Sequence, residues 1–136
     1  MTDIPQTTPT EAYDVLRQNA DAVYLDVRTA PEFEAGHPAG ARHVAVIFFG
    51  AGGQPRPNPD FVREVEAMLP HDAKILVGCQ AGGRSQRACE LLRDAGYADV
   101  TNVQGGFGGA RDQTGRLVTP GWRDAGLPVA QGAAKA

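Results

Sequence analysis

The sequence predicts an α/β domain in which a mainly parallel sheet carries helices on both of its faces. Short apolar runs rich in β-branched residues alternate along the chain with longer segments of helical periodicity. This alternation is typical of parallel strands joined by helices, and such sheets are covered on both sides. The 136 residues, 42% hydrophobic and 21% charged, suit a single domain with its own core. We expect that core over about 8–129 and a flexible tail at 130–136.

The first third of the chain predicts a helix, a strand and a shorter helix. Residues 8–19 place apolar side chains on one helical face, and Thr10 is the expected N-cap. The apolar run at 23–27 predicts a buried parallel strand. Residues 29–35 predict a short helix, with Thr29 as its cap and a proline in its first turn.

The rest of the chain continues the alternation of strands and helices. Further strands are expected at 42–47, 74–78 and 100–103, and further helices at 59–69 and 85–95. Residues 49–59 are rich in glycine and proline and predict a loop. The strand at 74–78 leads directly into Cys79, so this cysteine is expected at the carboxyl edge of the sheet, where such folds bind ligands.

Composition and charge disfavour several classes of function. The net charge is −3 and the basic residues form no stripe, so we expect no nucleic-acid partner. No apolar run approaches the roughly 20 residues of a membrane helix, and the first residues lack a signal-peptide pattern. The two cysteines, Cys79 and Cys89, form no disulfide scaffold, and no Cys or His pair has metal-ligand spacing. We expect a cytoplasmic protein with a reactive thiol, without a metal, a cofactor or a membrane partner.

The segment from Cys79 to Ser85 carries the chemistry, because it joins a predicted strand to a predicted helix. Its glycines, Gly82 and Gly83, allow successive N–H groups to converge on an anion, and the helix start adds unpaired donors. Arg84 adds a guanidinium suited to an oxyanion. These features favour the thiolate of Cys79 over the thiol. They predict a nucleophile whose partner is anionic, such as thiosulfate, a sulfonate-like group or a phosphate.

Four stretches resemble the rhodanese family, and they occur in the family's order from about residue 10 to residue 129. The loop C-x-x-G-x-R-S at 79–85 is similar to the family's active-site loop. The other similar stretches are LDVR at 25–28 with EF at 32–33 and GHPAGA at 36–41, NVQGGF at 102–107, and GLPV at 126–129.

The resemblance implies a three-layer rhodanese-like fold with a central five-stranded sheet. It implies a thiosulfate sulfurtransferase (rhodanese)-type enzyme in which Cys79 is the catalytic nucleophile and carries sulfur as a persulfide. The loop backbone then cradles the substrate anion and the terminal sulfur, and Arg84 binds the anion. The substrate-binding residues expected on this basis are Gln80, Ala81, Gly82, Gly83, Arg84 and Ser85. In this family a six-residue loop, as here, goes with sulfur transfer, and a seven-residue loop goes with phosphatases and arsenate reductases.

The reaction expected is a double displacement. The Cys79 thiolate takes the outer sulfur of a small anionic donor, such as thiosulfate or a low-molecular-weight persulfide, and then passes it to a thiol or to cyanide. One alternative is a non-catalytic or sulfur-relay module that acts with a protein partner. A phosphatase or arsenate reductase is a second alternative, which the six-residue loop disfavours.

Other residues have structural interpretations that we prefer. Asp26 and Arg28 are expected to form a structural ion pair or hydrogen-bond anchor, and His37 a hydrogen bond that fixes its loop. Cys89 is expected to be a packed helical thiol. Phe48 and Phe49 fit either a pocket mouth or ordinary core packing.

One segment departs from the family pattern. A tryptophan usually follows the glycine pair closely, but here residues 107–121 separate Gly106 from Trp122. If this insertion folds over the loop, Arg111 or Arg116 can reach the substrate. Solvated loop charges are the preferred interpretation.

Overall fold

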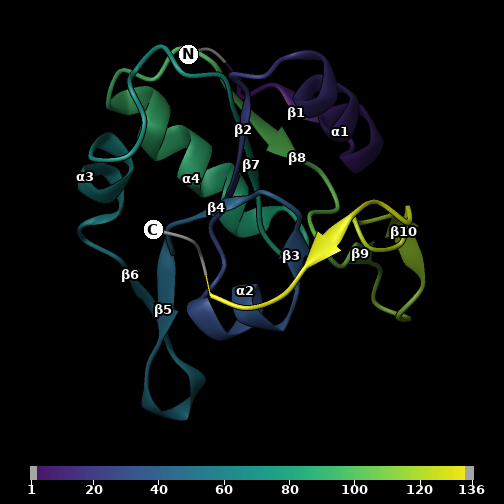
Figure 1. Cartoon of the computed structure of the whole chain (residues 1–136). Coiled ribbons are helices and arrows are strands. Elements are labelled where there is room, and N and C mark those ends of the chain that lie inside the picture. Colours follow the sequence, from purple (N-terminus) through teal and green to yellow (C-terminus); the bar gives the residue numbers. More distant parts are fainter. Residues whose placement is uncertain (1–2, 134–136) are drawn as a thin grey trace.

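The computed structural model describes residues 3–133 and has the predicted α/β architecture (Figure 1). Five strands, all paired in parallel, form one sheet in the order β1-β8-β7-β2-β4. They are β1 (Gln6–Thr7), β2 (Val23–Asp26), β4 (Arg42–His43), β7 (Ile75–Gly78) and β8 (Val100–Val103). The central strand is β7, so the residue that follows it emerges at the middle of the carboxyl edge.

Helices cover both faces of this sheet, which makes three layers (Figure 1). On one face lies α1 (Pro9–Gln18), and on the other lie α3 (Phe61–Glu66) and α4 (Gly83–Asp94). The short α2 (Ala30–Ala35) lies at the carboxyl end of the strands. The described residues include no helix long and apolar enough to cross a membrane.

Strand side chains alternate between two hydrophobic cores. Ile75 and Val77 belong to the core under α3 and α4, and Leu76 belongs to the core under α1. In β2, Leu25 belongs to the core under α3 and α4, and Tyr24 belongs to the core under α1. Because both faces are buried, these strands appear in the sequence as continuous apolar runs.

Several predicted boundaries were wrong. The cap of α1 is Thr8, not Thr10, because the partner needed for a reciprocal cap, Glu11, lies three residues after Thr8. The predicted strand at 42–47 ends at His43. The chain then leaves the sheet, and β5 (Ile47–Phe49) pairs antiparallel with β6 (Pro55–Pro57) around the 3-10 turn η1 (Ala51–Gly53), inside the predicted loop.

The last segments add two small antiparallel pairs. These are β3 (His37–Pro38) with β11 (Val129–Ala130), and β9 (Ala110–Arg111) with β10 (Leu117–Thr119). The expected flexible tail at 130–136 is held at its start, since Ala130 pairs with His37 and the N–H of Gly132 donates to Glu34 O at 2.9 Å. Residues 134–136 lie outside the described residues.

The insertion at 107–121 leaves the chain after the glycine pair and returns to it. Trp122 returns to the glycine pair, where its N–H donates to Gly106 O at 2.7 Å. Its indole is 1% exposed and packs edge-on against Tyr24 and Tyr13. The tryptophan therefore lies next to the glycine pair in space despite the insertion between them.

Candidate active site

Cys79 lies where the sequence places it, immediately after the central strand β7. The residue is 2% exposed, and its Sγ accepts a hydrogen bond from the Gly82 N–H at 3.0 Å. Gly82 has φ +116°, a left-handed conformation that glycine adopts without strain, and it is the N-cap of α4. The sulfur therefore lies against the N-terminus of a 12-residue helix, where unpaired N–H groups favour a negative charge.

The predicted loop residues surround this sulfur in different ways. Ala81 and Gly83 are exposed at the surface of the loop, and Gly83 already belongs to α4, two residues earlier than expected. Gln80 is anchored because its Oε1 accepts from Arg28 Nη1 at 3.3 Å. The insertion contacts the loop through its backbone, where the N–H of Phe107 donates to Cys79 O at 2.8 Å.

Ser85 connects the sulfur to a residue that sequence reasoning missed as part of the site. Its Oγ lies 3.4 Å from Cys79 Sγ and donates a hydrogen bond to Asn102 Oδ1. Asn102 is buried on β8, and its Nδ2 donates to Gln6 Oε1 at 2.8 Å and to Gly82 O at 3.3 Å. These bonds fix the amide so that its oxygen faces Ser85. The signal in the sequence was an asparagine within an otherwise buried strand.

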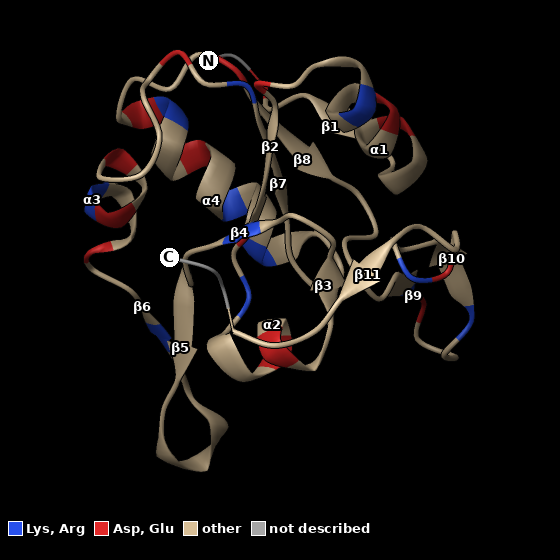
Figure 2. Cartoon of the chain, in the orientation of Figure 1, with Lys and Arg blue, Asp and Glu red and all other residues tan. Residues whose placement is uncertain are grey.

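Arg84 is held by a carboxylate that sequence reasoning also missed as part of the site. Its Nη1 and Nη2 donate to Glu32 Oε1 and Oε2 at 2.7 and 3.0 Å, and its guanidinium lies 5.7 Å from the centre of the Phe49 ring. Figure 2 shows the acidic α2 and the basic start of α4 at the same end of the molecule. Arg84 therefore joins α2 to the loop. Its role in binding the anion stays a prediction.

This pair has shifted titration properties. Burial alone raises the pKa of Glu32, but the hydrogen bonds from Arg84 and from the N–H and hydroxyl of Thr29 outweigh it and lower the pKa to about 2. The hydrogen bond to Glu32 raises the pKa of Arg84. Both groups stay charged throughout the neutral range.

The predicted structural roles of Asp26, Arg28 and His37 are confirmed. Arg28 Nη2 donates to Asp26 Oδ2 at 2.7 Å and to Gly36 O at 2.6 Å, and both charged residues are buried. His37 Nδ1 lies 2.7 Å from Phe33 O. These hydrogen bonds join the end of β2 and the end of α2 to Gln80, and so they hold the start of the active-site loop in place.

Cys89 and the insertion arginines lie outside this network. Cys89 is fully buried, and burial raises its pKa to about 12, so it remains a packed thiol. Arg111 is exposed and bonds within its own hairpin, to Gly115 O at 3.2 Å, and Arg116 is exposed. Within residues 3–133, neither arginine hydrogen-bonds to the loop, and no His, Cys, Asp and Glu cluster could hold a metal ion.

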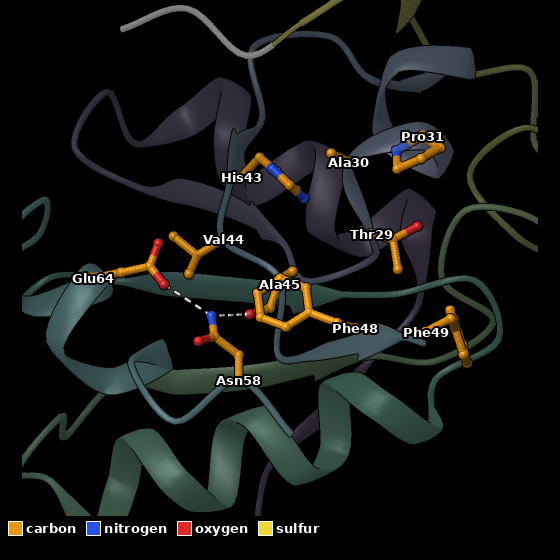
Figure 3. Close-up of a pocket in the computed structure, with 10 residues that line it drawn as sticks. All are labelled: Thr29, Ala30, Pro31, His43, Val44, Ala45, Phe48, Phe49, Asn58 and Glu64. Atoms are coloured by element: carbon orange, nitrogen blue, oxygen red, sulfur yellow. Dashed lines mark hydrogen bonds between the residues drawn. The ribbon is translucent and has the colours of Figure 1, made fainter. Parts of the chain in front are cut away.

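Two hollows lie near the loop. One, of about 430 Å³, is walled by the loop at 81–83 together with Gln6, Asn102 and Thr119. The other, of about 460 Å³, lies among the starts of α2 and α3 and the chain between β4 and β5, as Figure 3 shows. Cys79 lines neither hollow, but the first includes the glycines beside its sulfur and the second includes Phe49, which contacts Arg84.

Known proteins share the sequence pattern and the fold of this chain. The model of the rhodanese-like domain family matches residues 8–112. The chain is 43% identical over 98 residues to "Thiosulfate sulfurtransferase 16, chloroplastic" of Arabidopsis thaliana, covering 72% of this chain and 79% of that protein. It is 37% identical over 106 residues to "Senescence-associated protein DIN1" of Raphanus sativus, covering 76% of this chain and 56% of that protein. Among solved structures, Rv0390 from M. tuberculosis superimposes with a TM-score of 0.79 at 30% identity, covering 96% of this chain and all of that one.

Proposed function

The chain belongs to the rhodanese-like domain family, and from this premise we propose that it is a thiosulfate sulfurtransferase-type enzyme that works through a persulfide on Cys79. One observation carries the proposal. The Cys79 sulfur sits at the N-terminus of α4 and accepts a hydrogen bond from the Gly82 N–H at 3.0 Å. The same N–H donors also face the anion that approaches the sulfur.

The first half of the reaction loads sulfur onto the enzyme. The Cys79 thiolate attacks the outer sulfur of thiosulfate, the S–S bond of the donor breaks, and sulfite leaves with its electron pair. The Gly82 N–H and the start of α4 then stabilise the persulfide that remains. The Ser85 hydroxyl carries one proton, and it lies within reach of both Asn102 Oδ1 and the sulfur.

The second half returns the enzyme to its starting state. A nucleophilic acceptor, either a thiol or cyanide, attacks the outer sulfur of the persulfide. The bond to Cys79 breaks and the cysteine leaves as a thiolate, so no external oxidant or reductant is consumed. A covalent intermediate between two substrates predicts ping-pong kinetics.

Initial-rate kinetics with thiosulfate and cyanide test this proposal. We expect parallel double-reciprocal lines, loss of turnover in Cys79→Ser, and retained turnover in the matched variant Cys89→Ser. Turnover that survives in Cys79→Ser would overturn the proposal. Hydrolysis of an aryl phosphate in place of sulfur transfer would favour the phosphatase alternative. Turnover only with a protein persulfide as donor would favour a relay.

A further inference from the structure

The hollow in Figure 3 adjoins the loop without being part of its anion cradle. Two of its lining residues contact the Arg84–Glu32 pair, since Phe49 lies under the Arg84 guanidinium and Thr29 donates to Glu32 Oε1 at 2.9 Å. The end of the hollow at Phe49 and Thr29 therefore lies next to Arg84. The opposite end is bordered by Glu64 at the start of α3.

The polar atoms that face this hollow are mainly hydrogen-bond acceptors. His43 Nε2 lies 2.7 Å from the Arg28 carbonyl and must donate to it, so Nδ1 is the acceptor whenever the ring is neutral. Glu64 Oε1 accepts from Asn58 Nδ2 at 2.8 Å, and Oε2 accepts no hydrogen bond from the described residues. None of the ten residues that line the hollow is a lysine or an arginine. The Glu64 end thus suits a hydrogen-bond donor of positive charge.

Aromatic rings give the hollow an apolar side. Phe48 and Phe49 are 47% and 52% exposed, although aromatic side chains of this size are normally buried. Both line the hollow in Figure 3. Covering such rings with a short carbon chain removes apolar surface from water, and an ammonium group is also attracted to their faces.

We infer that this hollow is the acceptor subsite, and that it selects small thiols that carry a protonated amine. The inference deepens the proposed function and rests on it. The ammonium lies at Glu64, the carbon chain lies over Phe48, and the thiolate points toward Arg84 and the loop. An anionic donor is kept to the loop, because the residues that line the hollow include the Glu64 carboxylate and no lysine or arginine.

The step that this subsite serves is the second half of the reaction. The aminothiolate sulfur attacks the outer sulfur of the Cys79 persulfide, the bond between the two persulfide sulfurs breaks, and its electron pair leaves on Cys79. The acceptor becomes an aminothiol persulfide. Its thiol proton goes to solvent before attack.

The test compares cysteamine with 2-mercaptoethanol as acceptors of sulfur from thiosulfate. In Glu64→Gln, which keeps an Oε1 acceptor for Asn58, we expect kcat/KM for cysteamine to fall about threefold to fivefold, as for a partly exposed ion pair. The value for 2-mercaptoethanol should stay within about twofold. Glu66→Gln, on the same helix but outside the hollow, is the matched control and should change neither value. Equal changes for both acceptors, or none, would overturn the inference.

Two further measurements separate this inference from the proposed function. Loading of sulfur from thiosulfate, followed by intact mass, should be the same in Glu64→Gln and in the unmodified protein. A protein that never loads contradicts the proposed function instead. In that case NMR titration with cysteamine still tests the subsite: the amide signals of Phe48 and Phe49 should shift, and should shift less in Glu64→Gln. Unmoved signals would overturn it.

Discussion

Replacing Glu32 with glutamine tests how firmly α2 holds the active-site loop. The Glu32 carboxylate accepts hydrogen bonds from both terminal nitrogens of Arg84 and from the N–H and hydroxyl of Thr29. The substitution Glu32→Gln removes the negative charge that accepts these four hydrogen bonds and keeps the size of the side chain. The loop residues themselves are unchanged, so the effect reports on the contact between α2 and Arg84.

The magnitude follows from the pKa of Glu32. Folding lowers this pKa from 4.5 to about 2. At about 1.36 kcal/mol for each pKa unit, the Glu32 carboxylate contributes at most about 3.4 kcal/mol to the free energy of unfolding. The two side chains are 18% and 30% exposed, so solvent screening reduces this. We expect Glu32→Gln to lower the free energy of unfolding by about 1–2 kcal/mol at neutral pH.

The pH dependence of this difference has a definite sign. Because folding lowers the pKa of Glu32, its contribution is complete above about pH 4.5 and is lost as the pH falls toward about 2. Urea unfolding from pH 7 down to pH 3 should therefore show the two proteins converging. Glu34→Gln on the exposed side of the same helix is the control and should change little. A difference in the free energy of unfolding that is absent at pH 7, or constant down to pH 3, would show that the Glu32 carboxylate does not stabilise the fold through these hydrogen bonds.

Three more predictions concern residues around the site. In native protein near pH 9, iodoacetamide should modify Cys79 and spare Cys89, whose pKa is about 12; peptide mass analysis that finds Cys89 modified first would contradict this. Tyr24→Phe should raise the free energy of unfolding by about 1 kcal/mol, because the buried hydroxyl of Tyr24 has no hydrogen-bond partner within residues 3–133. A lower melting temperature would count against it. Gly106→Ala should lower the free energy of unfolding by about 2 kcal/mol or more and should lower turnover, because Gly106 has φ +51° and a Cβ there would collide with Cys79 O. Unchanged kinetics and an unchanged melting temperature would contradict this.

Much of the fold was predictable because the strands are buried on both faces and form apolar runs. The helices of the two outer layers were also found, and Cys79 followed from its place after β7. One error was local, since Thr8 and not Thr10 caps α1. The larger error lies where tertiary contacts override local sequence. The strand expected at 42–47 stops at His43 because the chain turns away to form the β5–β6 hairpin. Residue spacing carries no information about such a departure.

The candidate site was only partly predictable for a similar reason. The loop from 79 to 85 is contiguous, so its glycines, arginine and cysteine appear together in the sequence. Its supports come from distant segments. Glu32 is 52 residues from Arg84, and Asn102 is 17 residues from Ser85. No local pattern pairs these residues, so the hydrogen bonds that position the loop required the structure.

The place of the insertion at 107–121 relative to the loop also had to come from the structure. Its two arginines were expected to be solvated loop charges unless the insertion folded over the loop. The structure closes the insertion on itself between Phe107 and Trp122 and leaves both arginines exposed. The insertion contacts the loop through two backbone hydrogen bonds, from the Phe107 N–H to Cys79 O and from the Gly108 N–H to Gln80 O, and within residues 3–133 its two arginines donate none to the loop.

The most direct test of the central claim is the intact mass of the protein after incubation with thiosulfate. We expect a gain of about 32 Da, one sulfur atom, that dithiothreitol removes. We expect the same gain in Cys89→Ser and none in Cys79→Ser. A protein that gains no sulfur, or a Cys79→Ser variant that gains as much as the unmodified chain, would contradict it.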